Sequence, residues 1–134
     1  MDLKQEIIEF LQREFPQFIH TIEEVGDQAA TVRYKVGADA LRPGGTVSGP
    51  TLFGIADSAM YVAVLGEIGI VPLAVTTNMN INFLRKPSAE QDVIGTCKLL
   101  KVGRSLAVGE ITMYSDGDPA PVAHAVGTYA IPNK

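Results

Sequence analysis

Asp57 interrupts the most apolar stretch of the sequence, which runs from residue 51 to residue 72 and carries one other charged residue, Glu67. If this stretch is helical, the residues three and four positions away contact Asp57, and none of them is charged: Phe53, Gly54, Met60 and Tyr61. Burying a carboxylate without a cation is costly, and such costs concentrate at functional sites. We therefore regard Asp57 as a candidate functional residue. The structural alternative is that Asp57 points to solvent or is held by a backbone amide of a neighbouring strand.

Glycines lead into the same stretch, as Gly44-Gly45 and Ser48-Gly49. The first turn of a helix presents unpaired N–H groups with a partial positive field, which can polarise a carbonyl or receive an oxyanion. Gly49 is the candidate donor. Loop glycines also permit positive φ angles, so the glycines alone are a weak signal.

Gly49 and Asp57 are eight residues apart, which is about 12 Å along one helix at a rise of about 1.5 Å per residue. One substrate carbonyl cannot contact both groups of a single chain. If both act on the same group, they come from two copies of the helix, side by side and antiparallel across a two-fold axis. This hypothesis makes a homodimer necessary for catalysis.

Two helices and six strands are expected to position these residues. Apolar residues at helical spacing predict an amphipathic helix over about residues 2–15, which ends before Pro16. A second, buried helix is predicted over about residues 49–65, with Ser48 as its N-cap and Gly66 as its stop.

The rest of the chain is rich in residues that favour strands. The first two predicted strands form a hairpin with Gly26-Asp27 as the turn, and the last four form a meander. The result is an α+β architecture in which an antiparallel sheet wraps around the long apolar helix, and in which a second subunit covers what one sheet cannot. The predicted strands span residues 18–25, 29–36, 73–84, 92–102, 105–114 and 122–131.

The composition fits one domain over residues 1–134, and the net charge of −4 argues against a nucleic-acid surface. The only cysteine, Cys97, excludes an intrachain disulfide and a multi-cysteine metal site. The N-terminus does not resemble a secretory signal, and the apolar stretch carries Asp57 and Glu67, which disfavours a membrane span. We expect a cytoplasmic protein that binds neither membranes nor nucleic acids.

Three segments carry a family resemblance, in the same order as in the family and together covering about residues 40–131. The segment Ser48-Gly-Pro-Thr-Leu-Phe-Gly-Ile-Ala-Asp57-Ser-Ala is similar to a His-Gly-Gly motif followed by an apolar helix and Ala-Asp. The segment from Val75 to Pro87 resembles a central strand that ends in proline, and Leu100 to Ser105 resembles a strand-turn-strand with Gly-Arg. These are features of hotdog-fold thioesterases of the phenylacetic-acid-pathway, or PaaI-like, type.

The resemblance implies a hotdog fold, a homodimer or dimer of dimers (a homotetramer), and hydrolysis of acyl-CoA at the subunit interface without a metal or organic cofactor. By resemblance, Asp57 is the general base or nucleophile, and the Gly49 amide polarises the thioester carbonyl. Thr76 on the central strand helps to place the water or the carboxylate.

The remaining predicted contacts concern substrate binding. The family pattern places Lys101, Gly103 and Arg104 near the CoA phosphates, although these charges are also compatible with a solvated turn. Phe53 and Tyr61 are candidate contacts for a medium-sized or aromatic acyl group, but apolar helix positions such as these are often plain core.

Three residues depart from the family pattern: Ser48 replaces the histidine, Pro50 replaces the second glycine, and Arg42 replaces an asparagine. Ser48 caps the helix but does not titrate near neutral pH, and Pro50 removes one amide donor, which leaves Gly49 as the oxyanion contact. Arg42 either holds Asp57 ionised or binds an acidic acyl group. Ser48 and Arg42 are therefore counted among the substrate-binding candidates.

Two alternatives to a thioesterase remain open at this point. The first is a non-catalytic acyl-CoA-binding or regulatory hotdog module, in which Arg42 and Asp57 form a structural ion pair. The second is an acyl-thioester hydratase or dehydratase, which requires a histidine beside the carboxylate. No histidine lies near Asp57 in the sequence.

Overall fold

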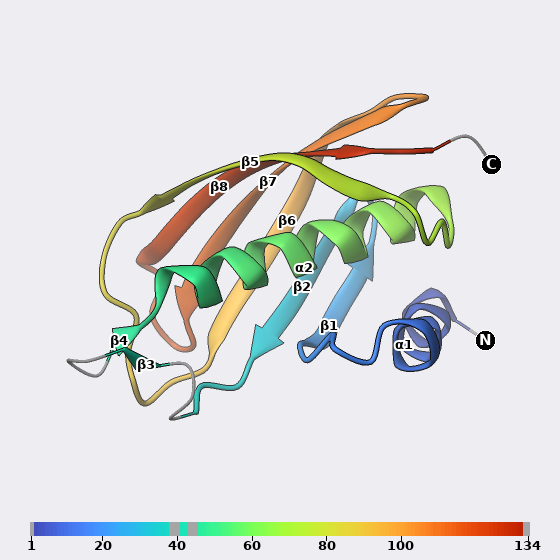
Figure 1. The fold of residues 1–134 in the computed structure, drawn as a ribbon. Helices are drawn as coiled ribbons and strands as arrows, with labels where there is room; N and C mark the ends of the chain where they lie inside the picture. Colours follow the sequence, from blue (N-terminus) through green and yellow to red (C-terminus); the bar gives the residue numbers. More distant parts are fainter. Residues whose placement is uncertain (1, 38–40, 43–45, 133–134) are drawn as a thin grey trace.

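The computed structural model describes residues 2–37, 41–42 and 46–132. Figure 1 shows two helices and a curved sheet, whose elements follow one another along the chain in the order below. These are α1 (Leu3–Glu14), β1 (Thr21–Gly26), β2 (Ala29–Tyr34), β3 (Leu41–Arg42), β4 (Thr46–Val47), α2 (Gly49–Ile68), β5 (Val75–Phe83), β6 (Val93–Val102), β7 (Leu106–Ser115) and β8 (Pro121–Ala130).

The main sheet has six antiparallel strands in the order β1-β2-β6-β7-β8-β5, and β3 with β4 forms a separate short hairpin. The sheet curves around α2, so that its two edge strands, β1 and β5, lie on opposite sides of the helix (Figure 1). The predicted antiparallel sheet around one central helix is confirmed. The other helix, α1, packs against β1 and near the C-terminal end of α2.

The predicted meander of four strands is wrong for β5. Only β6, β7 and β8 are consecutive neighbours, whereas β5 pairs with β8 at the edge of the sheet, from Val75↔Ala130 to Phe83↔Ala123. The connection between β5 and β6 carries the chain back to β2, and β6 then forms hydrogen bonds with β2. Local patterns reveal strands but not their neighbours, so the sequence did not show that β5 is an edge strand.

The central helix α2 begins where the sequence predicts and ends later. Ser48 caps it, and its side chain accepts a hydrogen bond from Thr51 N at 3.3 Å. The predicted stop at Gly66 is wrong, because the helix continues to Ile68 and is capped by Gly69, whose φ is 90°. Gly66 serves packing instead: a Cβ there would lie 2.6 Å from Cγ2 of Val25 on β1.

The turn between β1 and β2 lies one residue later than predicted. Asp27 and Gln28 are its central residues, with φ angles of 53° and 61°. Two residues with positive φ are typical of a type I′ turn, whose twist matches that of the flanking strands. Gly26 is the last residue of β1 rather than a central turn residue.

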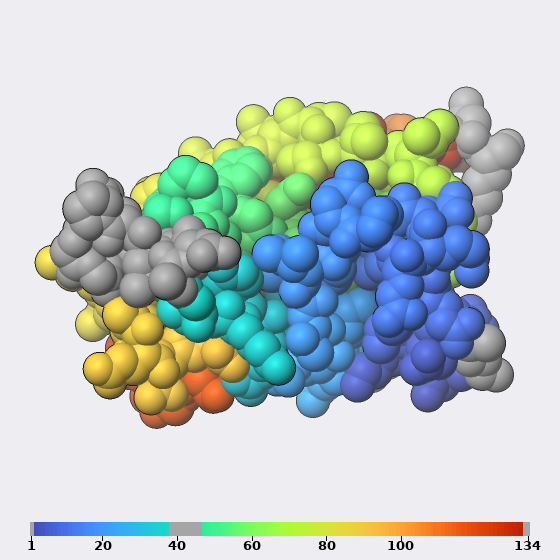
Figure 2. Space-filling model, turned by 60° about the horizontal axis from the view of Figure 1, so that its bottom comes forward, coloured from blue at the N-terminus to red at the C-terminus, as the bar shows by residue number. Residues whose placement is uncertain are grey.

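α2 is buried on most sides and forms the core of the protein. By length and composition alone it would also pass as a membrane span, but most of it lies against the sheet and α1, as expected for the core helix of a soluble protein. In the space-filling view, green atoms of α2 still reach the surface beside the blue atoms of α1 and β1 (Figure 2). The buried residues of α2 are Leu52, Ile55, Ala56, Ala59, Met60, Tyr61, Val62, Ala63, Val64 and Leu65.

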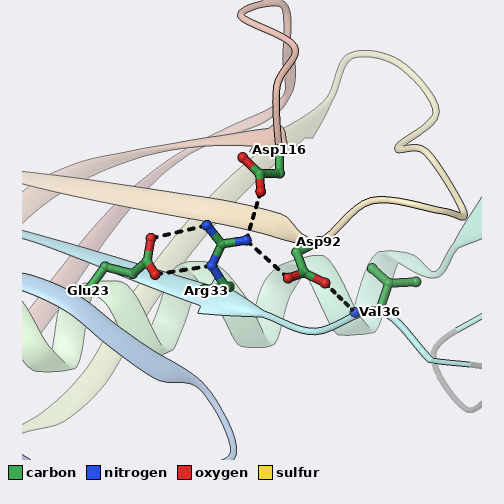
Figure 3. A network of polar contacts seen from close by, with 5 residues as sticks. All are labelled: Glu23, Arg33, Val36, Asp92 and Asp116. Carbon is green, nitrogen blue, oxygen red and sulfur yellow. Dashed lines mark hydrogen bonds and ion pairs between the residues drawn. The ribbon is translucent and has the colours of Figure 1, made fainter.

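A network of charges ties several strands together at the end of β2 (Figure 3). The guanidinium of Arg33 donates to Glu23 at 3.1 Å, to Asp92 at 3.0 Å and to Asp116 at 2.8 Å. Asp92 also accepts the N–H of Val36 at 3.3 Å, at the start of the connection that leads towards α2. The network therefore joins β1, β2, the start of β6 and the turn after β7.

Candidate active site

Asp57 is half-buried on α2, and two hydroxyl groups hold its carboxylate. Thr76 Oγ1 donates to Asp57 Oδ1 at 2.5 Å, and the hydroxyl of Tyr129 donates to the same oxygen at 2.9 Å. No lysine, arginine or histidine among the described residues lies within ion-pair distance of Asp57. The hydrogen-bond donors to the Asp57 carboxylate come from side chains of the sheet rather than from a backbone amide.

The two donors are brought together by strand pairing. Thr76, near the start of β5, is the register partner of Tyr129, near the end of β8, and both side chains reach Asp57 on α2. A bulge between Thr76 and Asn78 shifts the register beyond this pair. Three elements therefore converge on one carboxylate oxygen.

Tyr129 was missed by the sequence reasoning. Its side chain is 2% exposed, and burial together with the negative charge of Asp57 raises the pKa of Tyr129 well above its usual value. The hydroxyl therefore remains a donor throughout the neutral range. The pattern along β8 contained a signal for Tyr129. Alternate residues of this strand are buried, and Tyr129 is the large polar residue that follows the small residues Ala123, Ala125 and Gly127 in this series.

Asp57 lies in the wall of a cavity of about 510 Å³. Aromatic rings dominate the wall: the ring centroids of Tyr61 and Tyr129 are 6.1 Å apart, and those of Tyr61 and Phe15 are 6.2 Å apart. α1 and the turn after it supply part of the lining, a role that the sequence did not indicate for them. The lining residues are Phe10, Glu14, Phe15, Phe18, Asp57, Ser58, Tyr61, Pro72, Ala74, Val75, Thr76 and Tyr129.

The charges in this wall are negative. Among the lining residues, the acidic groups are Asp57 and Glu14, and Glu14 forms a solvent-exposed ion pair with Arg13 at 3.7 Å. No basic side chain is part of the lining. The field inside the cavity therefore disfavours an anionic ligand group.

Gly49 and Ser48 lie away from the cavity, at the start of α2. Ser48 caps the helix, and Gly49 is its first residue. Within the described chain, no acceptor pairs with the Gly49 N–H. A Cβ on Gly49 would lie 3.3 Å from Cζ of Phe83, at the far end of β5 from Thr76.

The predicted substrate contacts are distributed over different places. Tyr61 lines the cavity, whereas Phe53 is exposed on α2 and does not line it. Lys101 and Arg104 are exposed on the β6–β7 hairpin, where the Gly103 N–H donates to Leu106 O at 2.8 Å.

This hairpin lies at the Thr76 end of the sheet. Leu106 pairs with Ala130, and Ala130 pairs with Val75, the neighbour of Thr76. The backbone of Arg42 forms part of β3, and the prediction for its side chain lies outside the described residues.

Other reactive side chains lie elsewhere. Burial raises the pKa of the Cys97 thiol to about 12, so it is not a nucleophile at neutral pH. His20 precedes β1 rather than lying within the first strand, and its pKa is lowered by burial. His124 contacts Glu110 at 3.3 Å on the outer face of the sheet. The described residues contain no cluster of three or more metal-ligating side chains.

The chain is similar to known proteins in both sequence and fold. Residues 44–122 match the Thioesterase superfamily. A protein from Silicibacter sp. TM1040, provisionally named a thioesterase, is 44% identical, and the alignment covers 97% of this chain and 92% of that one with a TM-score of 0.90. No curated protein sequence matches the chain.

Two more distant structures share the fold. The PaaI protein from the phenylacetic acid degradation operon of E. coli is 22% identical, over 95% of this chain and 94% of that one, with a TM-score of 0.79. A hypothetical thioesterase from Streptococcus pneumoniae, solved with coenzyme A, is 20% identical, over 97% of each chain, with a TM-score of 0.79.

Proposed function

The chain belongs to the thioesterase superfamily and has a PaaI-like hotdog fold, and from this premise we propose that it hydrolyses acyl-CoA thioesters with Asp57 as the reactive carboxylate. One observation carries the proposal. The Asp57 carboxylate, which has no cationic partner among the described residues and is held by Thr76 and Tyr129, forms part of the wall of a largely apolar cavity. Such a group is available to remove a proton or to attack a carbonyl carbon.

The proposed site is completed by a second copy of the chain. On β5, Thr76 marks the end near Asp57, and Phe83 marks the end near Gly49. Since β5 is an edge strand, antiparallel pairing with its copy brings Thr76 of one subunit level with Phe83 of the other. Gly49 of one chain then lies beside Asp57 of the partner subunit.

Exposed apolar side chains support this interface. Phe53 on α2 and Val75, Phe83 and Leu84 on or beside β5 are 39%, 53%, 54% and 51% exposed. A long edge strand and apolar residues around it are features that proteins normally cover. We propose that a homodimer covers them and that dimers can pair further into tetramers.

In the proposed reaction, the Gly49 N–H donates to the thioester carbonyl oxygen and stabilises the negative charge that develops there. Asp57 of the partner subunit either takes a proton from the attacking water or attacks the carbonyl carbon itself. In the first route, the water oxygen forms the new C–O bond, the C–S bond breaks, and the proton that Asp57 took from the water passes to the leaving thiolate. In the second, a mixed anhydride forms, CoA thiolate leaves, and water then hydrolyses the anhydride.

The cavity indicates the acyl group. Its aromatic lining favours a medium-sized or aromatic apolar acyl group, and the negative charges of Glu14 and Asp57 disfavour an acyl group that ends in a carboxylate. We propose that Lys101, Gly103 and Arg104, on the hairpin at the same end of the sheet, contact the CoA phosphates, and that the protein acts in the cytoplasm.

The test is thiol release from a panel of short, medium, aromatic and dicarboxylic acyl-CoAs, with the parent protein and Asp57→Asn compared at equal folding and dimer content. Activity in the parent that falls by orders of magnitude in the variant supports the proposal. Binding of acyl-CoA without turnover by either protein contradicts it and supports a non-catalytic binding module.

A further inference from the structure

We propose that Tyr129 is a positioning residue whose hydroxyl fixes the Asp57 carboxylate so that Oδ2, rather than Oδ1, is presented to the substrate. The inference deepens the proposed function and rests on it. It starts from an asymmetry of the carboxylate: both hydroxyl donors, from Thr76 and Tyr129, bond to Oδ1. Within the described residues, no donor bonds to Oδ2.

This asymmetry matters because rotation about χ2 of aspartate is loosely restricted and nearly two-fold. Without fixed donors, the two oxygens exchange places readily. A carboxylate that is held through one oxygen keeps the other aimed in one direction, as nucleophilic attack or proton removal requires.

Tyr129 is the more rigid of the two donors. Its ring is 2% exposed, stacks on Tyr61 at an interplanar angle of 25°, and belongs to β8, which is paired on both sides, with β7 and with β5. Thr76 lies on the edge strand β5 beside a bulge. The phenol therefore sets the direction of the carboxylate, and the Thr76 hydroxyl follows it.

The Tyr129 hydroxyl also lies 3.2 Å from the main-chain oxygen of Asp57. One hydroxyl carries one proton and serves one acceptor at a time, and the shorter contact, 2.9 Å, is with Oδ1. The main-chain oxygen of Asp57 is therefore the alternative acceptor for this hydroxyl.

The titratable groups around this contact come from three elements: Glu14 on α1, Asp57 and Tyr61 on α2, and Tyr129 on β8. Burial raises the pKa of Tyr61 as well, so both phenols stay protonated at neutral pH. Neither phenol ionises in this range, so the Tyr129 hydroxyl remains a donor to Oδ1 of Asp57.

The experiment replaces Tyr129 with phenylalanine, which keeps the ring and removes the hydroxyl. Tyr114→Phe, on the neighbouring strand β7 and away from the cavity, is the matched control. Steady-state kinetics against pH are measured for the parent, both variants, Thr76→Val and the Thr76→Val/Tyr129→Phe double variant, with an acyl-CoA that the parent hydrolyses.

We expect Tyr129→Phe to lower kcat about 10- to 100-fold, the scale of a lost hydrogen bond to a charged group, with little change in KM. The acid limb of the kcat/KM profile should move to higher pH, because a donor to the charged form has been lost. The losses from Thr76→Val and Tyr129→Phe should not be additive, since both act through one oxygen. A purely structural role would not move the pH profile.

A second readout does not depend on turnover. The NMR signal of the Asp57 carboxyl carbon, assigned by its loss in Asp57→Asn, is followed against pH in the parent and in Tyr129→Phe. A signal that changes at higher pH in the variant than in the parent supports the positioning role of Tyr129. If this is seen but no acyl-CoA is hydrolysed, only the proposed function fails. A titration unchanged from the parent, or an active parent matched by Tyr129→Phe in kcat and in pH profile, overturns the role of Tyr129.

Discussion

Two groups of acidic side chains in this protein have opposite surroundings. At the end of β2, Glu23, Asp92 and Asp116 surround one guanidinium, that of Arg33. On α2, Asp57 is held by the neutral hydroxyls of Thr76 and Tyr129. The first arrangement neutralises charge and ties strands together, whereas the second fixes a carboxylate in place with no cation from the described side chains beside it. Carboxylates of the second kind, rather than of the first, are the ones expected at functional sites.

The largest expected effect is the loss of the Asp57 carboxylate. Asp57→Asn keeps the size and hydrogen-bonding capacity of the side chain but removes its negative charge. We expect kcat for acyl-CoA hydrolysis to fall by about 100- to 10,000-fold, the range for loss of an acid–base group, with the fold intact by circular dichroism. Comparable turnover by the variant and the parent would remove Asp57 from the mechanism.

Subunit complementation tests whether the site is shared between two chains. Gly49→Pro removes the proposed amide donor, and proline is well suited to the first turn of a helix, so α2 should still form. This variant and Asp57→Asn should each be inactive, and co-refolding them in equal amounts should restore about a quarter of the parent activity. Half of the dimers are then mixed, and each has one intact site out of two.

Matched controls accompany this measurement. Mixing the two variants without unfolding should restore nothing until the subunits exchange. Recovery of activity that does not depend on dimer formation, or no recovery despite mixed dimers seen by mass spectrometry, would argue against a site built from two subunits.

On the structural side of the comparison, Arg33→Met should lower the melting temperature by a few degrees, because three carboxylates lose their shared partner and repel one another. Arg13→Met is the control, since Arg13 forms a single solvent-exposed pair with Glu14 and should change little. Calorimetry provides the measurement. Equal melting temperatures for the parent and Arg33→Met would show that the network adds no stability.

The smallest effect expected concerns His20 at acid pH. Burial lowers the pKa of His20 in the folded state. Below about pH 6.5 the unfolded chain therefore binds a proton at His20 more readily than the folded protein does. The free energy of unfolding should therefore decrease as pH falls from 7 to 5, and less so in His20→Gln. Urea unfolding at both pH values measures this, and an identical decrease in the two proteins would assign the acid sensitivity to other groups.

Much of the architecture was predictable from local patterns. The spacing of apolar residues placed α1 and α2, and Asp2 caps α1 by accepting the N–H of Gln5 at 2.8 Å. The predicted end of α2 was wrong because Gly66 is of the residue type that often ends a helix, whereas here its lack of a side chain lets Val25 approach. Glycine has two uses, conformational freedom and lack of volume, and the sequence does not distinguish them.

The candidate site was predictable only in part. Asp57 was recognisable because a charge in an apolar helix is a local anomaly. The aromatic residues Phe10 on α1 and Phe15 directly after it were not assigned to the cavity, because nothing near them in the sequence indicates a contact with Asp57. The exposed position of Phe53 depends likewise on how α2 rotates against the sheet.

By itself, then, the sequence determined the two helices, the six strands of the main sheet and a carboxylate inside an apolar helix, but not the short hairpin of β3 and β4, because propensity and periodicity act over a few residues. The tertiary structure decided that β5 forms the edge and that Tyr129, 72 residues away in the chain, bonds to Asp57. Such contacts depend on which strands become neighbours, and that choice reflects the burial of the whole core rather than any local preference.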